Sequence, residues 1–368
     1  MAGLRSASLP QANLAMRETR YVRQHDIAQS LAILVRARGA AGPEEWPAEG
    51  RCAGNNLRGR SKTTAMRIAV TGTTGFVGRA LVPALAARQH DVRALGREVL
   101  GDIAAYRGWA RVLEGVDAVV HLAAIAHRRG SSEARLRAVN IEAPVALGKA
   151  AAATGAHMLF LSSVKALGEE TTGAPLDEAS PFVPRDAYGR AKAEAERSLR
   201  AIAGLKLTVL RPPLVYGPGV KANFFALLRA VDRGLPLPLA SVVNRRSLVY
   251  VGNLANVIVR CLELPQAAGR TYLVSDGEPS STPQLVRILA NALGQPERLF
   301  PCPPWLLRVA GALLGQGDSV RRLTSSLEVD DRAVRRELGW APPFTFEEGI
   351  RLTARWYLDC YSGMKRRD

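Results

Sequence analysis

Short apolar runs alternate with helical stretches through most of the chain from residue 66 onward. Strands are expected at residues 67–71, 91–95, 117–122, 157–161 and 205–210, of which the first and third are apolar runs. Residues 77–87 and 187–203 instead repeat their apolar positions at helical intervals. Strands joined by helical crossovers run parallel, so the pattern predicts an α/β fold, a Rossmann doubly wound parallel sheet with a smaller C-terminal lobe.

The chain is predicted to have three parts. Residues 1–65 hold few aromatic residues, lack the apolar core of a secretory signal and carry acidic residues that argue against a transit peptide. We expect a disordered or poorly ordered extension, with Met66 as one candidate for the natural first residue. Residues 66–211 are predicted to form the Rossmann domain, with a later contribution near residues 245–260. Residues 212–360 are expected to form mainly the smaller lobe.

Composition and charge narrow the class of protein. A formal net charge of +17 attracts polyanions, but the basic residues are spread along the chain and no zinc-finger or RNA-recognition motif accompanies them. We therefore do not expect nucleic acid as a partner. The four cysteines have no paired spacing and no histidine companions, which argues against a metal site or a disulfide framework and fits a cytoplasmic location.

No stretch of the sequence predicts a membrane span. A membrane-spanning helix needs roughly 18 uninterrupted apolar residues, and no window of this chain provides them. The most apolar candidate, residues 305–314, is short and carries Arg308. We interpret it as a lobe helix packed on the core rather than as a membrane anchor.

A glycine turn follows the first predicted strand and reads Thr71-Gly72-Thr73-Thr74-Gly75-Phe76-Val77-Gly78. Its glycines allow a tight turn, a close approach of backbone to a pyrophosphate and close packing of the next helix, whose positive end faces the phosphates. The preceding strand and the following helix are the context that this motif requires. The residues expected to bind a dinucleotide here are Gly72, Thr74, Gly75, Phe76, Val77 and Gly78.

The end of the second strand bears on the choice of cofactor. An acidic residue there would bind the adenosine ribose of NAD, whereas this chain has Gly96 followed by Arg97. A guanidinium suits a 2′-phosphate, so NADP is favoured and NAD stays open, as does a solvent-facing Arg97. Further cofactor contacts are expected from a pair that would border the adenine, Asp102 and Ile103. Others are expected from the residues after the third strand, Leu122, Ala123 and Ala124.

Tyr188 and Lys192 lie four residues apart, on one face of a predicted helix. A phenol is a poor base at neutral pH, and a fixed cation beside it would lower the pKa of Tyr188 towards the useful range. Ser163 follows the strand at residues 157–161, where its hydroxyl can hold a reacting oxygen beside the phenol. These three residues predict proton transfer coupled to nicotinamide chemistry.

With these motifs, residues 66–357 resemble the extended short-chain dehydrogenase/reductase family, in its NAD-dependent epimerase/dehydratase group. The resemblance implies that Ser163 and Tyr188 are catalytic, that Lys192 binds the nicotinamide ribose and that Asn140 supports the site. It places Pro213 in the loop where nicotinamide meets the sugar. It also implies a UDP-sugar substrate, whose diphosphate would contact Asn223 and Arg246. A homodimer is expected by the same resemblance, and the lobe at residues 212–360 would bind the substrate.

The sequence leaves several reactions open. The run at residues 212–254 is similar to bacterial surface-polysaccharide enzymes that are UDP-sugar 4-epimerases or UDP-N-acetylquinovosamine 4-reductases. The chain as a whole matches neither pattern fully. It departs from the epimerase pattern at Gly96 and Leu167, and from the 4,6-dehydratases at Val164 and Lys165, where those enzymes carry an acidic pair. We therefore expect reduction of a UDP-4-keto-6-deoxy-N-acetylhexosamine in O-antigen synthesis. The alternatives are UDP-glucose or UDP-N-acetylglucosamine 4-epimerisation and a non-catalytic NADP-sensing regulator.

Overall fold

The computed structural model describes residues 65–125 and 132–361. Their contacts divide the chain into two compact units. The larger unit contains residues 65–220, 244–280 and 325–361 apart from the gap, and the smaller one contains residues 221–243 and 281–324. The extension expected at residues 1–65 lies, except for Ala65, outside the described residues. The predicted functional division at residue 211 stays a prediction.

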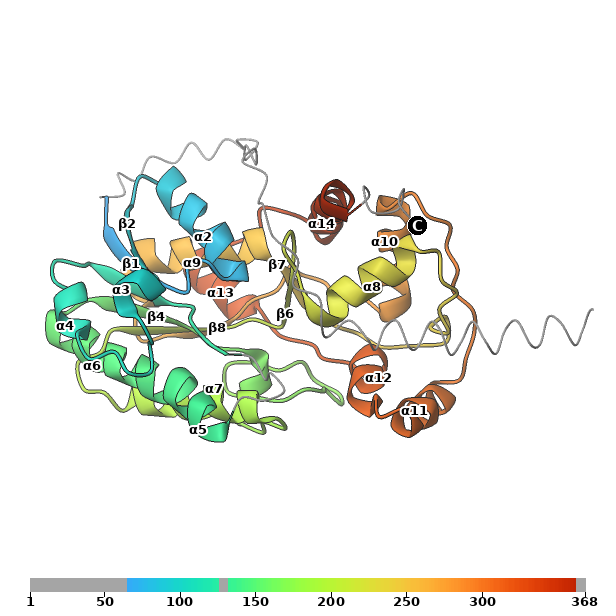
Figure 1. Ribbon diagram of the computed structural model, residues 1–368, viewed down its shortest axis with the longest axis horizontal. Coiled ribbons are helices and arrows are strands. Elements are labelled where there is room, and N and C mark those ends of the chain that lie inside the picture. Colours follow the sequence, from blue (N-terminus) through green and yellow to red (C-terminus); the bar gives the residue numbers. More distant parts are fainter. Residues whose placement is uncertain (1–64, 126–131, 362–368) are drawn as a thin grey trace, which may run out of the picture. The chain divides into compact units, whose positions relative to one another are not determined.

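A parallel six-stranded sheet forms the centre of the larger unit (Figure 1). Its strands are β1 (Arg67–Thr71), β2 (Asp91–Leu95), β3 (Ala118–His121), β4 (His157–Leu161), β5 (Leu207–Arg211) and β8 (Thr271–Leu273), arranged in the order β2-β1-β3-β4-β5-β8. Five of these strands were predicted to within two residues. The Rossmann doubly wound sheet is therefore confirmed.

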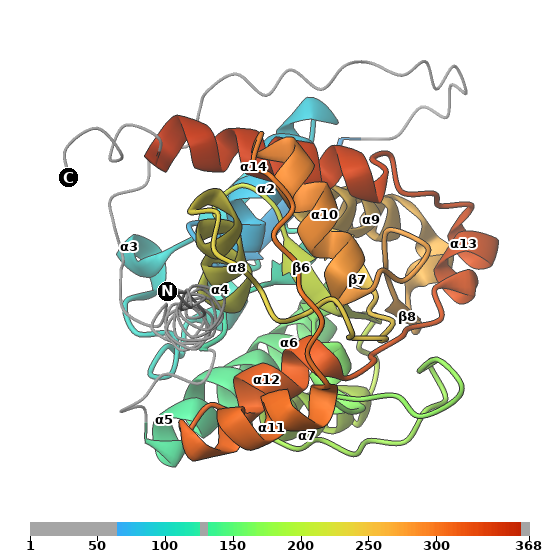
Figure 2. The same cartoon turned by 90° about the vertical axis from the view of Figure 1, so that its right-hand side faces the viewer.

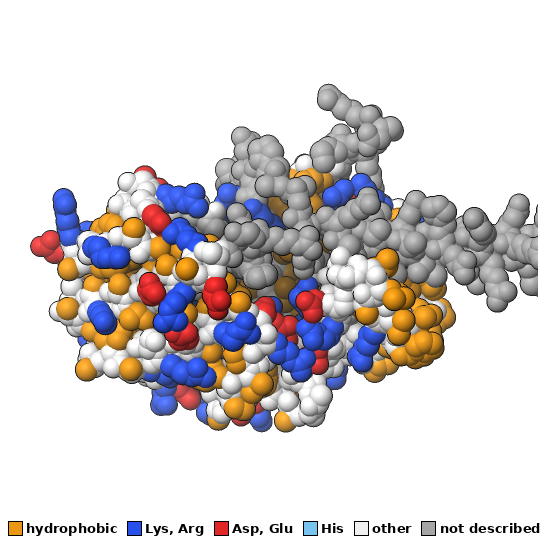
Figure 3. Space-filling model, turned by 60° about the horizontal axis from the view of Figure 1, so that its bottom comes forward, with side chains coloured by type: hydrophobic (Ala, Val, Ile, Leu, Met, Phe, Trp, Pro, Cys, Tyr) orange, Lys and Arg blue, Asp and Glu red, His pale blue; other side chains and the backbone are white. Residues whose placement is uncertain are grey.

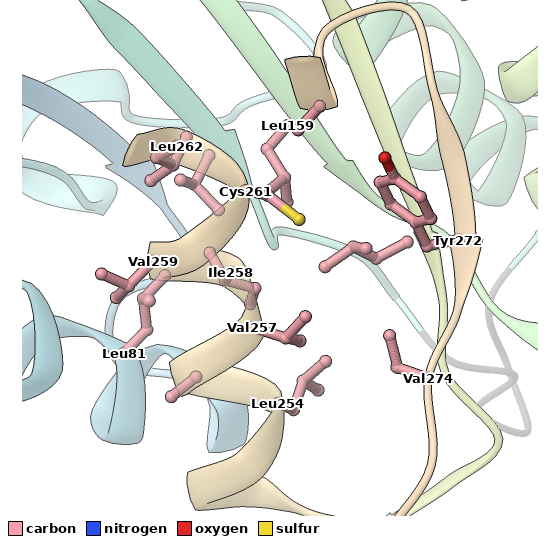
Figure 4. Packing of buried hydrophobic residues seen from close by; sticks show 14 of the residues in the cluster. Leu81, Leu159, Leu254, Val257, Ile258, Val259, Cys261, Leu262, Tyr272 and Val274 are labelled. Atoms are coloured by element: carbon pink, nitrogen blue, oxygen red, sulfur yellow. The ribbon is translucent and has the colours of Figure 1, made fainter. Parts of the chain in front are cut away.

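Helices cover both faces of this sheet. One face packs against α2 (Phe76–Ala87), α9 (Val251–Glu263) and α13 (Arg332–Leu338), and the other against α3 (Arg97–Leu100), α4 (Trp109–Val112), α6 (Ala143–Thr154) and α7 (Ala187–Arg200). Successive strand residues serve opposite faces, since Ile68 and Val70 join the α9 side while Ala69 joins the α7 side. Figure 4 shows α9 directing Leu254, Val257, Ile258 and Cys261 into the core.

Shorter elements complete the larger unit. Strands β6 (Leu214–Tyr216) and β7 (Leu248–Tyr250) pair in parallel, and α14 (Phe346–Tyr361) closes the described chain. The remaining short segments are α5 (Glu133–Arg137), the π-helical turn η1 (Ala138–Glu142) and the 3₁₀ turns η2 (Val164–Ala166) and η3 (Pro265–Ala267).

The smaller unit is built from two pairs of helices (Figure 2). In one pair, α8 (Ala222–Asp232) packs against α10 (Thr282–Ala292). In the other, α11 (Pro304–Leu313) packs against α12 (Gly317–Thr324).

The order of the strands indicates where a ligand binds. From β1 the chain moves outward to β2 and then returns to the opposite side of β1 to form β3. Doubly wound sheets bind ligands at the carboxyl ends of the strands where this reversal occurs. The turn after β1 and the segment after β3 therefore border the expected cofactor site.

Candidate active site

The glycine turn after β1 is packed too closely for side chains at two of its glycines. Gly72 adopts a φ of +75°, and a Cβ on it would lie 2.9 Å from the backbone nitrogen of Ala123. A Cβ on Gly78 would lie 2.6 Å from Cα of Thr73. The turn is thus pressed against both the end of β3 and the helix that follows it.

The N-terminus of α2 presents donors that suit an anion. Gly75 precedes α2 without a side-chain cap, and the first turn of the helix contains no acidic residue. The first N–H groups of a helix lack partners within the helix and carry partial positive charge. Thr74 and Gly75 are exposed, while Phe76 and Val77 are partly buried. The residues at this turn therefore fit the pyrophosphate of a dinucleotide.

His121 connects the ends of β1 and β3. Its Nδ1 lies 3.0 Å from Oγ1 of Thr71, which also accepts a hydrogen bond of 3.3 Å from the backbone nitrogen of Ala123. Burial lowers the pKa of His121 to about 3, so the ring is neutral at physiological pH. The three residues fix the segment after β3, in which Leu122 and Ala123 are partly buried and Ala124 is exposed.

Glu98, in the first turn of α3 after β2, is an acidic residue that the sequence did not identify. Its carboxylate folds back over Gly96, so that a Cβ on that glycine would overlap Oε1 and lie 2.5 Å from Oε2. Arg97, predicted to meet a 2′-phosphate, is exposed beside it. The end of β2 therefore presents charges of both signs.

The predicted adenine-bordering pair lies just beyond α3. Asp102 receives two hydrogen bonds from Arg135 of α5, at 2.5 and 2.7 Å, and the Arg135 guanidinium lowers the pKa of its carboxyl. Ile103 packs against the core cluster that contains Leu95 and Leu100. Asp102 is thus held as an anion on the surface, and Ile103 provides the apolar member of the pair.

Ser163 is held in extended backbone where β4 ends. Hydrogen bonds on either side of it tie the chain to the end of β5, from Ser162 N to Leu210 O at 2.8 Å and from Val164 N to Pro212 O at 2.9 Å. Pro213, the buried residue that follows Pro212, is therefore held beside the serine segment. The Oγ atom of Ser163 accepts a hydrogen bond of 3.3 Å from the backbone nitrogen of Lys165, which leaves its proton available.

Tyr188 is brought to this segment by the start of α7. Asp186 caps the helix through a 2.7 Å hydrogen bond from the Gly189 nitrogen, and its second oxygen lies 2.6 Å from Nζ of Lys165. A Cβ on Gly189 would overlap the carbonyl oxygen of Lys165, so the helix lies directly against η2. The turn that carries Tyr188 and the loop that carries Ser163 are therefore packed together.

Lys192 occupies the next turn of α7, below Tyr188. Its Nζ donates a hydrogen bond of 2.8 Å to Leu161 O and lies 5.8 Å from the centre of the Tyr188 ring and 4.6 Å from that of Phe160. The side chain is only 2% exposed, and burial lowers the pKa of Lys192 to about 8.

The pKa of Tyr188 differs from the sequence-based expectation. Burial, with a further contribution from Asp186, raises it to about 12 rather than lowering it. The expectation treated Lys192 as a fully charged neighbour, whereas its ammonium is itself desolvated and is bonded to Leu161 O. Tyr188 therefore carries its proton at neutral pH in this structure.

Asn140 acts through the segment after β3. It is 1% exposed within η1, and its side-chain amide exchanges two hydrogen bonds of 2.9 Å with the backbone N–H and carbonyl of Ile125. Both ends of the amide are engaged by this one residue. Asn140 therefore fixes this segment, and its support of catalysis stays a prediction.

A buried ionic network lies beneath the serine segment. Glu196 is 0% exposed and accepts a hydrogen bond from Ser162 Oγ, while Arg211 at the end of β5 donates to it at 2.7 Å. Neighbouring charges that are both buried require such direct pairing. The network connects α7 and the ends of β4 and β5 next to the residues that the sequence predicts to be catalytic.

The two residues predicted to bind the substrate diphosphate belong to different units. Asn223 is a partly buried residue in the first turn of α8, in the smaller unit. Arg246 belongs to the larger unit, where its Nη1 donates a hydrogen bond of 2.9 Å to Ser325 O. Their joint role in substrate binding stays a prediction.

Two further features of the described residues bear on the class of protein. Across residues 65–125 and 132–361, no group of three His, Cys, Asp or Glu side chains is placed to hold a metal ion. No helix within those ranges is long and apolar enough to cross a membrane.

Comparison with known proteins identifies the family. The sequence model of the NAD dependent epimerase/dehydratase family matches residues 68–275. These residues contain the glycine turn, Ser163, Tyr188 and Lys192. The chain belongs to this family. It is thus an NAD(P)-dependent enzyme of the epimerase/dehydratase type, as the sequence motifs predicted.

Individual relatives agree with this assignment. The chain is 41% identical over 312 residues to a UDP-glucose 4-epimerase of Vibrio cholerae, which covers 79% of the chain and 95% of the relative. It is 28% identical to a 2-alkyl-3-oxoalkanoate reductase of Stenotrophomonas maltophilia, over 78% of the chain and 98% of the relative. The solved UDP-glucose 4-epimerase of Thermus thermophilus in complex with NAD is 28% identical, with a TM-score of 0.63 over 79% of the chain and 99% of that structure.

Several residues that support the candidate active site were not predicted from the sequence. Glu98, Lys165, Asp186 and Glu196 each depend on contacts that spacing does not encode. The only available signal was Asp186, which directly precedes a predicted helix and is a favoured N-cap residue.

Proposed function

We propose that the protein transfers a hydride to or from C4 of the sugar in a UDP-hexose. The observation that carries this proposal is the packing of α7 against η2, which brings the turn that carries Tyr188 against the loop that carries Ser163. Because the strands of the sheet are parallel, this loop follows β4 at the same edge as the glycine turn after β1. The 41% identity with a UDP-glucose 4-epimerase supports the substrate class.

The protein residues have distinct tasks in this reaction. NAD(P), when bound, would supply the group that accepts or donates the hydride. The Tyr188 hydroxyl, protonated at neutral pH, gives its proton to O4 of a ketone as C4 is reduced, and takes that proton back in the reverse direction. Ser163 Oγ would donate a hydrogen bond to the same oxygen, and Lys192 would hold the nicotinamide ribose near Tyr188.

Two observations favour 4-epimerisation as the finer activity. The relative from Vibrio cholerae is a UDP-glucose 4-epimerase. In addition, the Glu98 carboxylate over Gly96 would hydrogen-bond a free ribose hydroxyl and repel a 2′-phosphate, which favours NAD over NADP. An epimerase oxidises and then reduces the same sugar, so it works best with a cofactor that is not exchanged.

A second candidate activity is the reduction of a UDP-4-keto-6-deoxy-N-acetylhexosamine during the synthesis of a surface polysaccharide. The exposed Arg97 at the end of β2 favours it, because a guanidinium suits an exchangeable NADPH. Leu167 also favours it, since this residue is 2% exposed in an apolar cluster at a position where epimerases commonly carry a tyrosine. A cytoplasmic location and a homodimer stay predictions.

One assay separates the two activities. Purified protein would be incubated with UDP-glucose or UDP-N-acetylglucosamine and catalytic amounts of NAD or NADP, and proton NMR would follow the C4 epimer. Epimer formation without net cofactor reduction supports the first candidate. Consumption of NADPH with a UDP-4-keto-6-deoxy sugar, and no epimer, supports the second. Absence of both reactions in the wild-type protein would reject C4 chemistry.

A further inference from the structure

Helix α11 of the smaller unit carries an exposed apolar face. Trp305, Val309 and Leu313 follow at intervals of four residues, which aligns them along one side of the helix, and they are 66%, 50% and 83% exposed. Leu306 and Leu314 extend this surface, at 44% and 56% exposure. Figure 3 shows the corresponding gathering of hydrophobic side chains, in orange, at the right of that view.

The opposite side of α11 is the one that packs. Leu307 and Gly311, also four residues apart, are its buried residues. A Cβ on Gly311 would lie 2.5 Å from Cγ2 of Val320 in α12, so the two helices are in close contact at that point. The sequence predicted the helix correctly. It did not predict that only this narrow face would be packed, leaving the other apolar face exposed.

The unit that carries this face has an excess of basic residues. Helix α11 contains no acidic residue, and Arg308 is exposed at the edge of the apolar stripe. Asp318, the acidic residue of α12, is paired with Arg321 at 2.9 Å. Residues 221–243 and 281–324 contain eight Lys and Arg but only three Asp and Glu. The apolar face therefore belongs to a positively charged unit.

The length of α11 determines how it could meet a lipid bilayer. Ten residues of helix span about 15 Å, roughly half of a bilayer's hydrocarbon core. A short helix with an apolar face, a tryptophan and an exposed arginine is instead suited to lie in the interface, where tryptophan is favoured and arginine meets lipid phosphates.

We propose that the α11 face is a docking surface for an anionic membrane. Trp305, Val309 and Leu313 enter the boundary between headgroups and acyl chains, and Arg308 contacts lipid phosphate. Charge favours this occupant over a second copy of the chain, because a symmetric contact would place the same positive surface against itself. The inference is independent of the reaction at C4 and would place that reaction at a membrane surface.

Vesicle sedimentation tests the proposal with the full-length protein. We expect binding to vesicles of phosphatidylcholine with phosphatidylglycerol, weaker binding to phosphatidylcholine alone, and weakening as salt is raised. Leu313→Glu should reduce binding about tenfold or more, because it removes an inserted side chain and adds an anion. Val183→Glu is the matched control, since Val183 is 58% exposed in the larger unit. Thermal melting would confirm that both variants fold.

Tryptophan fluorescence locates the contact. Trp109, Trp340 and Trp356 are 3%, 4% and 6% exposed, so in a Trp46→Phe background brominated lipid should quench mainly Trp305. Quenching that disappears in Trp305→Phe supports the proposal. Equal vesicle binding by Leu313→Glu and wild type would overturn it. So would a concentration-dependent dimer that protects Trp305 without lipid and is abolished by Leu313→Glu, which would identify a second copy as the occupant.

Discussion

The Nζ atom of Lys192 donates a hydrogen bond of 2.8 Å to the carbonyl oxygen of Leu161, the last residue of β4. This bond fixes α7 against the strand end only two residues before Ser163. Lys192, which we propose to hold the nicotinamide ribose, is thereby kept in a defined position by the protein itself. Four further residues support this arrangement, and they are Lys165, Asp186, Gly189 and Glu196.

Replacement of the proposed acid should stop turnover without disturbing cofactor binding. Tyr188→Phe keeps the ring but removes the hydroxyl that gives and takes the proton, so kcat should fall by about 10²–10⁴-fold. NAD(P) titration should give a Kd close to that of wild type. Tyr272→Phe, which removes a hydroxyl bonded to Glu337 at the far edge of the sheet, is the control and should keep its activity. Full activity in Tyr188→Phe would contradict the assignment.

The contact between Gly189 and Lys165 should be essential for placing Tyr188. Gly189→Ala forces a methyl group into the Lys165 carbonyl, which should cost about 1–3 kcal/mol of unfolding free energy and lower kcat more than it raises KM. Chemical denaturation and steady-state kinetics would measure both effects. Gly317→Ala introduces the same methyl group where no atom lies within 4 Å, and should change neither. A stable Gly189→Ala variant with normal kcat would contradict this explanation.

Glu98 should set the preference between NAD and NADP. Wild type should bind NAD more tightly, and Glu98→Gln should narrow the difference by strengthening NADP binding several-fold, because the repulsion of a 2′-phosphate is removed. Isothermal titration of both cofactors would measure this. Glu114→Gln, an exposed substitution of the same type, should leave the ratio unchanged. Tighter NADP binding by wild type would instead support Arg97 as the determinant.

The sequence predicted those features that depend on local pattern. Strands β1, β3, β4 and β5 and the glycine turn are encoded in runs of a few residues, because burial on both faces requires largely apolar stretches and a tight turn requires glycine. The edge strand β2 is mostly exposed and was predicted from the alternation of strands and helices. The spacing of Tyr188 and Lys192 likewise follows from the helical repeat. Strand β8, only three residues long, carries too little pattern to be distinguished from a loop.

Features that depend on the path of the chain were not predictable in this way. The position of Glu98 over Gly96 follows from how the backbone turns from β2 into α3, and the pKa of Tyr188 follows from burial that no spacing reports. Lys165 was predicted only as a departure from the acidic pair of the 4,6-dehydratases, whereas its ion pair with Asp186 spans 21 residues. Side-chain direction and burial thus decide how the predicted residues act.

The buried network of Glu196 and Arg211 should be costly to break. Glu196→Gln leaves the Arg211 charge, which is 2% exposed, without its counterion and should reduce the free energy of unfolding by about 3–5 kcal/mol. Adding Arg211→Met should recover part of this loss, because the uncompensated charge is removed. Arg287→Met breaks an exposed pair with Glu297 and should cost no more than about 1 kcal/mol. Urea unfolding would compare the variants, and equal losses would contradict the role given to burial.

Two buried histidines should make the fold sensitive to acid. Burial lowers the pKa of His121 to about 3 and that of His157 to about 4, both below the value of 6.5 expected when unfolded. The unfolded chain therefore binds protons that the folded chain does not. Their contribution to stability is complete above pH 6.5 and is lost as the pH falls to about 4 for His157 and to about 3 for His121. His121→Asn should reduce the slope of unfolding free energy against pH by about one proton, or about 1.4 kcal/mol per pH unit, between pH 6 and 4.5. Urea unfolding across this range would measure the slope, with His157→Gln as the second case, and an unchanged slope in both variants would show that neither histidine is the titrating group.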